Sequence, residues 1–219
     1  NVSVLISEWA DGGDLLEYLK NNILQLSVKE WRVILFQIIS VLAIIQAKYP
    51  GFRHNDLKAN NILIQKVEAR NKNNKFKYKI NGNIYIIPNI GFQIKIWDFD
   101  FSCIDGVVDN TKVNAEWTDK INISSSKNRY YDLHYFMNTL TRKGFIPDFW
   151  EIEQIPKAVK DFFERIVPEK YRIGDNVAER GRLLVNDEYA IPDDVLINDP
   201  FFNKFRPRIE GNDAKNTSS

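Results

Sequence analysis

Two short stretches of the sequence carry acidic side chains beside other groups that can do chemistry. The first, FRHNDLKANNIL at 52–63, places Asp56 and Lys58 in front of an apolar run. The second, IWDFD at 96–100, ends an apolar run with Asp98 and a further acid. One carboxylate can accept the proton of a hydroxyl that attacks phosphorus, and another, with an amide oxygen, can hold Mg²⁺ on a polyphosphate. A lysine can neutralise the transferred phosphate, so the pattern indicates phosphoryl transfer.

Strand-like segments flank both stretches and must position them. NILIQKV follows the first stretch, and QIKIWDFDFS at 93–102 contains the second. Both are short, apolar and rich in isoleucine, which favours β-strands. Between them, KFKYKINGNIYIIP alternates on both sides of Asn81-Gly82, a dipeptide typical of hairpin turns. We therefore predict an inserted hairpin at about 66–93, and a further buried strand in VSVLIS at 2–7.

Helices are predicted for most of the remaining chain. DLLEYLKNN begins a helix with Asp14 near its start, and Ser27 followed by Glu30 predicts the capped start of a long helix that ends near Lys48. Residues 105–129 are polar and lack periodicity, which is typical of a long mobile loop. The other predictions are helical segments at 129–142, 155–167 and 193–205 and a disordered tail at 209–219.

The bulk composition fits one medium-sized domain and argues against several classes of protein. The 219 residues are 44% hydrophobic and can bury a good core. A formal charge of +1 argues against a nucleic-acid partner held by bulk electrostatics. The most apolar stretch, 33–47, is too short for a transmembrane segment. The single cysteine, Cys103, excludes an internal disulfide and fits a reducing, cytoplasmic location.

The two stretches FRHNDLKANNIL and IWDFD resemble protein-kinase motifs. HNDLKANN at 54–61 is similar to the catalytic loop H-R-D-L-K-x-x-N, and DFD at 98–100 resembles the D-F-G motif. Their order, spacing and flanking strands also match, and the lysine is of the serine/threonine type. The roles that the resemblance implies are a catalytic base for Asp56, a phosphate contact for Lys58, Mg²⁺ ligands for Asn61 and Asp98, and support of the loop for His54.

The resemblance covers most of the chain. SEWADGGDLLEYL at 7–19 is similar to the kinase hinge and the helix after it, and VLINDPFF at 195–202 resembles the end of the large lobe. The implied fold class is α+β: the mainly helical large, C-terminal lobe of a protein-kinase-like fold at 1–208, with small β-hairpins near the active site. The implied nucleotide-binding residues are Glu8, Ala10, Asp14 and Leu63, and Asp132 would anchor the catalytic loop from below.

The resemblance also implies an organisation and an activity. A hinge strand and linker would occupy 1–14, catalytic and metal-binding loops 52–102, and an activation segment 103–131. The sequence contains neither a G-x-G-x-x-G loop nor a V-A-I-K-type lysine, so we expect the small lobe to lie upstream and this fragment alone to be inactive. The implied reaction is ATP- and Mg²⁺-dependent phosphorylation of serine or threonine in protein substrates.

Motifs and composition are most similar to the divergent serine/threonine kinases of poxviruses and other large DNA viruses, which would place a viral protein in the host cytoplasm or the virion. Two residues depart from the kinase pattern. Asn55 replaces an arginine that usually holds a phosphorylated activation loop, and Asp100 replaces glycine, which adds a negative charge near the metal.

Two other functions share these motifs. Choline and aminoglycoside kinases have the same fold and also use H-x-D-x-x-x-x-N with an acidic residue after the second aspartate. GGDLLEYL, DLK and NDPFF look more like protein kinases and favour that reading. A non-catalytic, pseudokinase-like binding module is the third possibility, and the retained acids, lysine and asparagine of the two motifs argue against it.

Overall fold

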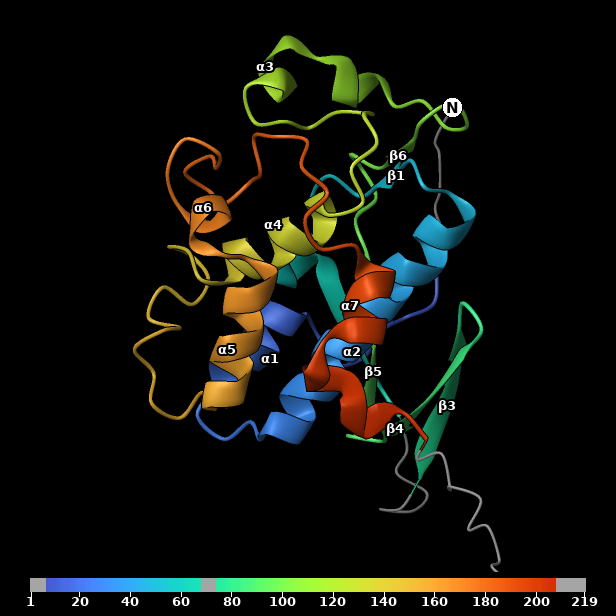
Figure 1. Cartoon of the computed structure of the whole chain (residues 1–219), viewed down its shortest axis with the longest axis vertical. Helices are drawn as coiled ribbons and strands as arrows, with labels where there is room; N and C mark the ends of the chain where they lie inside the picture. Colours follow the sequence, from blue (N-terminus) through green and yellow to red (C-terminus); the bar gives the residue numbers. More distant parts are fainter. Residues whose placement is uncertain (1–6, 68–73, 208–219) are drawn as a thin grey trace, which may run out of the picture.

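The computed structural model describes residues 7–67 and 74–207. The strand predicted at 2–7, apart from Ser7, and the tail predicted at 209–219 lie outside these residues. Helices form most of the core (Figure 1). The helices are α1 (Leu15–Asn22), α2 (Val28–Lys48), α3 (Glu116–Asp119), α4 (Tyr131–Leu140), α5 (Lys157–Ile166), α6 (Glu169–Arg172) and α7 (Pro192–Asn198), with 3-10 helices η1 (Ala59–Asn61), η2 (Thr111–Asn114) and η3 (Pro200–Phe205).

The two N-terminal helices begin where the sequence predicts. Ser27 and Glu30 form a reciprocal capping box on α2, in which the Ser27 backbone N–H donates to the Glu30 carboxylate at 2.8 Å. Asp14 caps α1. α2 is buried along most of its length, and α5, α7 and β5 pack around it. Among the described residues, no helix is long and apolar enough to cross a membrane.

Antiparallel strand pairs complete the fold; the strands are β1 (Phe52–Arg53), β2 (Ile62–Lys66), β3 (Lys75–Ile80), β4 (Asn83–Pro88), β5 (Phe92–Ile96) and β6 (Cys103–Ile104). β2 pairs with β5, and β1 pairs with β6. The predicted hairpin is confirmed as β3–β4, which turns at Asn81 and Gly82 with positive φ at both residues. It packs on α2 and η3, where the Tyr85 ring lies 5.1 Å from that of Phe36.

The strand predicted at 93–102 is wrong beyond Ile96. β5 ends there, and Trp97 to Asp100 are exposed. Asp98 has a φ of 60°, a left-handed conformation that cannot continue an extended strand. The acidic motif therefore lies beyond the end of β5, in an exposed turn.

The segment predicted as a mobile loop at 105–129 contains ordered structure. η2 and α3 lie within it (Figure 1), and Val113 and Ile123 are buried against Cys103. The Thr118 hydroxyl donates to the Val113 carbonyl at 2.8 Å. The apolar residues are too few and too widely spaced to give a helical or strand period, so the sequence pattern misses this small core.

His134 is buried on α4 in its neutral form. Its Nε2–H donates to the Tyr171 carbonyl at 2.6 Å, and its Nδ1 has no hydrogen-bond partner in the described part of the chain. Burial lowers the pKa of His134 to about 4, because the charged ring would lose its hydration; the Tyr171 carbonyl partly opposes this shift, and the Arg142 charge adds to it.

We expect this histidine to make stability depend on pH. The unfolded chain binds the His134 proton near its ordinary pKa of 6.5, whereas the folded chain binds it only near pH 4, so the free energy of unfolding should fall as pH decreases through this window. The expected loss is about 2 kcal/mol between pH 7 and pH 5. Urea unfolding at both pH values measures it, with His134→Gln as a non-titrating control. Equal losses in both proteins would contradict the assignment.

Candidate active site

The catalytic-loop stretch is held from α4. The Asp132 carboxylate, which is 0% exposed, accepts hydrogen bonds from the backbone N–H groups of His54 at 2.7 Å and Asn55 at 2.9 Å. Asn55 has a φ of 65°, a conformation that asparagine adopts more readily than most residues. Two charge-assisted bonds to consecutive amides therefore fix the turn that presents Asp56.

His54 joins the two chemical stretches. Its Nε2–H donates to the Trp97 carbonyl at 2.9 Å, and its Nδ1 faces the Asp56 N–H at 3.4 Å. Its ring also lies 5.1 Å from the ring of Phe99. One buried imidazole thus contacts the loop that carries Asp56 and the residues on both sides of Asp98.

Asn61 and Asp98 form the part of the site that fits a cation. The register of β2 on β5 pairs Ile62 with Ile96, and the Asn61 carbonyl accepts the Trp97 N–H at 2.9 Å, so Asp98 is one residue beyond the backbone partner of Asn61. The Asn61 Nδ2 donates to the Asp56 carbonyl at 2.9 Å and to Asp56 Oδ2 at 3.1 Å. Its Oδ1 and the Asp98 carboxylate accept no hydrogen bond from the described residues.

Carboxylate and amide oxygens are the ligands that Mg²⁺ prefers, and Mg²⁺ commonly takes one or two of them together with phosphates and water. Asn61 and Asp98 fit this chemistry. Within 7–67 and 74–207, no group of three or more His, Cys, Asp or Glu side chains is arranged to hold a metal.

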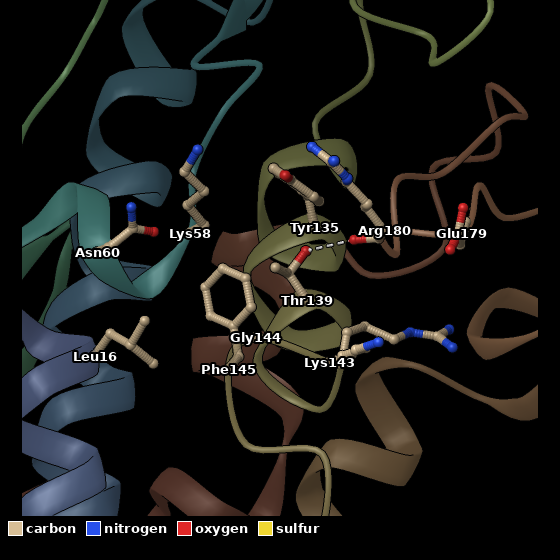
Figure 2. Close-up of a pocket in the computed structure, with 11 residues that line it drawn as sticks. Leu16, Lys58, Asn60, Tyr135, Thr139, Lys143, Gly144, Phe145, Glu179 and Arg180 are labelled. Carbon is tan, nitrogen blue, oxygen red and sulfur yellow. Dashed lines mark hydrogen bonds between the residues drawn. The ribbon is translucent and has the colours of Figure 1, made fainter.

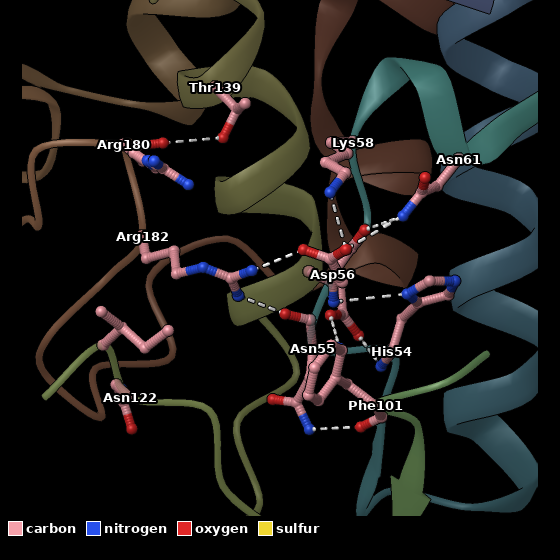
Figure 3. Close-up of polar contacts among 12 residues, drawn as sticks. His54, Asn55, Asp56, Lys58, Asn61, Phe101, Asn122, Thr139, Arg180 and Arg182 are labelled. Carbon is pink, nitrogen blue, oxygen red and sulfur yellow. Dashed lines mark hydrogen bonds and ion pairs between the residues drawn. The ribbon is translucent and has the colours of Figure 1, made fainter. Parts of the chain in front are cut away.

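Both oxygens of Asp56 are engaged by cations (Figure 3). Lys58 Nζ donates to Oδ2 at 2.8 Å, and the Arg182 guanidinium donates to Oδ1. Arg182 is only 7% exposed; it also donates to the Asn55 carbonyl and stacks 4.0 Å over the Tyr135 ring. Burial alone lowers the pKa of Arg182, but nearby hydroxyl groups and the Asp56 carboxylate produce a net upward shift, so it stays charged.

Arg182 is the site residue that sequence reasoning missed. It lies in the segment between α6 and α7, 126 residues after Asp56. The surrounding sequence, AERGRLL, matches no motif. Its hydrophobic pattern does not distinguish a buried arginine from a surface one. The segment is attached to α4, because the Thr139 hydroxyl donates to the Arg180 carbonyl at 3.1 Å and the Asn138 amide to the Gly181 carbonyl at 3.3 Å.

The residues predicted to bind nucleotide lie along the start of α1 and β2. Asp14 caps α1 by accepting the Glu17 N–H at 2.9 Å, and it forms a β-bridge with Leu63. A Cβ at Gly12 would lie 2.4 Å from a methyl group of Ile64, so only glycine lets the two segments approach this closely. The two remaining residues of this group are an exposed Glu8, whose carboxylate pairs with Lys95 at 3.1 Å, and a half-buried Ala10.

The segment after the DFD motif is held without a phosphate. Asn55 donates from its Nδ2 to the carbonyls of Phe101 and Ser124, both at 3.0 Å. Arg53, which is fully buried, donates to the Ser124 hydroxyl at 2.8 Å. The Asp100 carboxylate, which replaces the usual glycine, pairs with Lys112 in η2.

A cavity of about 430 Å³ opens beside Asp56, and we call it the Asp56 cleft. Its walls combine the charged groups of the site with aromatic side chains, so it can hold a side chain next to the carboxylate. The Phe101 and Trp117 rings meet edge to face at 5.8 Å on one side. The other lining residues are Lys58, Ile121, Ile123, Tyr135, Ala178, Glu179, Arg180 and Arg182.

Comparisons with known proteins identify the family of this chain. Residues 16–202 match the family model described as poxvirus serine/threonine protein kinase. Two proteins of Acanthamoeba polyphaga mimivirus, each named "Putative serine/threonine-protein kinase", are 52% identical over 94% of this chain and 44% of that protein, and 31% identical over 77% and 46%. The chain thus spans less than half the length of these relatives. A solved structure of the Rad53 kinase domain covers 90% of this chain and 65% of its own, with 14% identity and a TM-score of 0.42.

Proposed function

Because the chain belongs to the poxvirus serine/threonine protein kinase family, we propose that it carries the catalytic and metal-binding loops of an enzyme that transfers the γ-phosphoryl group of Mg-ATP to serine or threonine in proteins. The main support is the connection of the two stretches, in which Asn61 bonds to both Asp56 and Trp97 and so sets Asp98 beside the catalytic loop. In this proposal one site combines Asp56 as the base, the Lys58 ammonium as a cation and oxygen ligands for Mg²⁺.

In this proposal Asp56 is the base. The oxygen of the substrate hydroxyl bonds to the γ-phosphorus, the bond from that phosphorus to the bridging oxygen of ADP breaks, and the hydroxyl proton passes to Asp56. Mg²⁺, held by Asn61 and Asp98, would neutralise charge on the phosphates. Lys58 is a quarter exposed and must leave Asp56 Oδ2 to contact the transferred phosphate. Oδ2 then keeps only the hydrogen bond from the Asn61 amide and has room to accept the proton. Arg182 continues to hold the other oxygen.

His54 and Asp132 act as positioning residues in this proposal, because both bind the backbone of the loop and neither faces the Asp56 cleft. Glu8 and Ala10 would pair with adenine through their backbone, Asp14 would face the ribose, and Leu63 would pack against the base. All four lie on the segments that meet at the start of β2.

We place the part that covers the nucleotide outside this chain. Three aromatic side chains near the site are exposed: Trp9 by 83%, Trp97 by 41% and Phe99 by 49%. Trp9 follows Glu8, whose carboxylate reaches Lys95 two residues before Trp97, so the segments that carry these aromatic residues are close together. Exposed aromatic side chains of this kind suit contact with a packed small lobe, and the greater length of the viral relatives leaves room for one.

The test is transfer of label from γ-labelled ATP, comparing the 219-residue chain with a version extended at its N-terminus to the length of the relatives. We expect the extended protein to produce phosphoserine or phosphothreonine in a mixed protein substrate and to lose this activity when EDTA removes Mg²⁺. The 219-residue chain should be at least about 100-fold slower, because nothing covers the phosphates. Label that reaches only choline or an aminoglycoside, or nucleotide binding without turnover, would contradict the proposal.

A further inference from the structure

A second cavity, of about 700 Å³, adjoins the Asp56 cleft, and we call it the basic pocket (Figure 2). The two cavities share Lys58, Tyr135, Glu179 and Arg180. A substrate peptide that places one residue beside Asp56 can therefore place a neighbouring residue in the basic pocket. The lining includes neither Asn61, Asp98 nor Leu63, and of the residues assigned to metal and nucleotide phosphates it contains only Lys58.

The charges in the basic pocket favour an anion. Lys58, Arg142, Lys143 and Arg180 line it against a single acid, Glu179. The net charge of the whole chain is only +1, so this concentration of positive charge is local. In the described ranges, Arg142, Lys143 and Arg180 form no ion pair, whereas Lys58 is paired with Asp56.

Arg142 shows that this positive charge is poorly compensated. Its guanidinium donates to the Asn138 side chain at 3.1 Å and to the Arg172 carbonyl, while its buried Nε has no partner in the described part of the chain. Burial and the charge of Arg172 lower the pKa of Arg142. A carboxylate or phosphate bound in the pocket would supply the missing negative charge.

A hydrogen bond between two elements supports one wall of the pocket. Lys20 on α1 donates to the Gly144 carbonyl at 3.1 Å, which holds the turn after α4 against the first helix. The side chains of Leu16, Phe145 and Tyr135 give the pocket apolar surfaces (Figure 2). Such a site can hold the stem of a side chain on these apolar surfaces and its charged end among the cations of the lining.

We propose that the basic pocket binds an anionic side chain of the protein substrate, either an acidic residue or a phosphorylated one, close in sequence to the serine or threonine that enters the Asp56 cleft. This inference rests on the proposed function, because it takes the Asp56 cleft as the acceptor site. Proteins with acidic or previously phosphorylated residues near the acceptor serine or threonine would then be the preferred substrates.

The test is binding of short fluorescein-labelled peptides to the 219-residue chain by fluorescence anisotropy. Each peptide has one central serine among alanines, with flanking residues that are glutamate, phosphoserine or lysine. We expect the glutamate and phosphoserine peptides to bind about tenfold more tightly than the lysine peptide. The double substitution Lys143→Glu and Arg180→Glu should abolish this preference, and because both residues are exposed, the fold should be retained, as circular dichroism can check.

The matched control is Lys29→Glu with Lys204→Glu, which changes the net charge equally at exposed positions outside both cavities. The control should keep the anionic preference. Equal affinity for all three peptides, an equal loss of preference in the control, or displacement of the acidic peptides by ATP would overturn the inference. Because no turnover is measured, this result is independent of the transfer assay, which alone decides the proposed function.

Discussion

Replacing Asp56 with asparagine is expected to lower phosphoryl transfer by about 10²- to 10⁴-fold, the usual contribution of a general base. The amide has almost the same shape as the carboxylate and its oxygen can still accept from Arg182, but it cannot take the proton of the attacking hydroxyl. The affinity for Mg-ATP should change little, because Asn61 and Asp98 are assigned as the metal ligands. Initial rates and nucleotide affinity of the N-terminally extended protein provide the measurement.

The control for this experiment is Asp148→Asn, an exposed aspartate outside both cavities. It should keep the wild-type rate. Chemical unfolding of the Asp56 variant must accompany the assay, because loss of its charge also leaves Arg182 without its counterion. A folded Asp56→Asn protein that transfers phosphate at the wild-type rate would remove Asp56 as the base.

The second large effect is expected for Arg182→Ala. This change removes the guanidinium from a buried pair and leaves the Asp56 Oδ1 and the Asn55 carbonyl without their donor. Breaking a buried ion pair by deleting one partner typically costs about 3–5 kcal/mol. We expect a loss of this size in the free energy of unfolding, together with a lower transfer rate, because the carboxylate is no longer held in one orientation.

Arg180→Ala is the matched control for stability, since Arg180 lies in the same segment but its side chain is exposed. Its free energy of unfolding should stay within about 0.5 kcal/mol of the wild type. If Arg182→Ala is equally mild, the buried pair does not exist in solution. A stable Arg182 variant with a raised rate would instead identify Arg182 as an inhibitor of the base.

Local motifs made part of this site predictable. The order of HNDLKANN and DFD, the strands beside them and the capped helices at Asp14 and Ser27 depend on neighbouring residues, so a single sequence reveals them. The hairpin at Asn81-Gly82 was predictable for the same reason, because its turn requires two residues that accept positive φ.

Long-range contacts were not predictable in the same way. Arg182 reaches Asp56 only because the segment before α7 is attached to the end of α4, which no local pattern encodes. The residues between β6 and α4 read as a loop, since the burial of Val113 and Ile123 depends on packing rather than on periodicity. The early end of β5 follows from the left-handed backbone of Asp98, a residue whose type alone does not require it.

The most direct measurement is a crystal structure of the extended protein with Mn²⁺ and a non-hydrolysable ATP analogue, in which anomalous scattering locates the metal. We expect Mn²⁺ bound by Asn61 Oδ1 and the Asp98 carboxylate, the γ-phosphate between the metal and Lys58, and Asp56 facing that phosphate. A metal and triphosphate bound elsewhere, with the Asp56 carboxylate still paired with both Lys58 and Arg182, would contradict the proposed site.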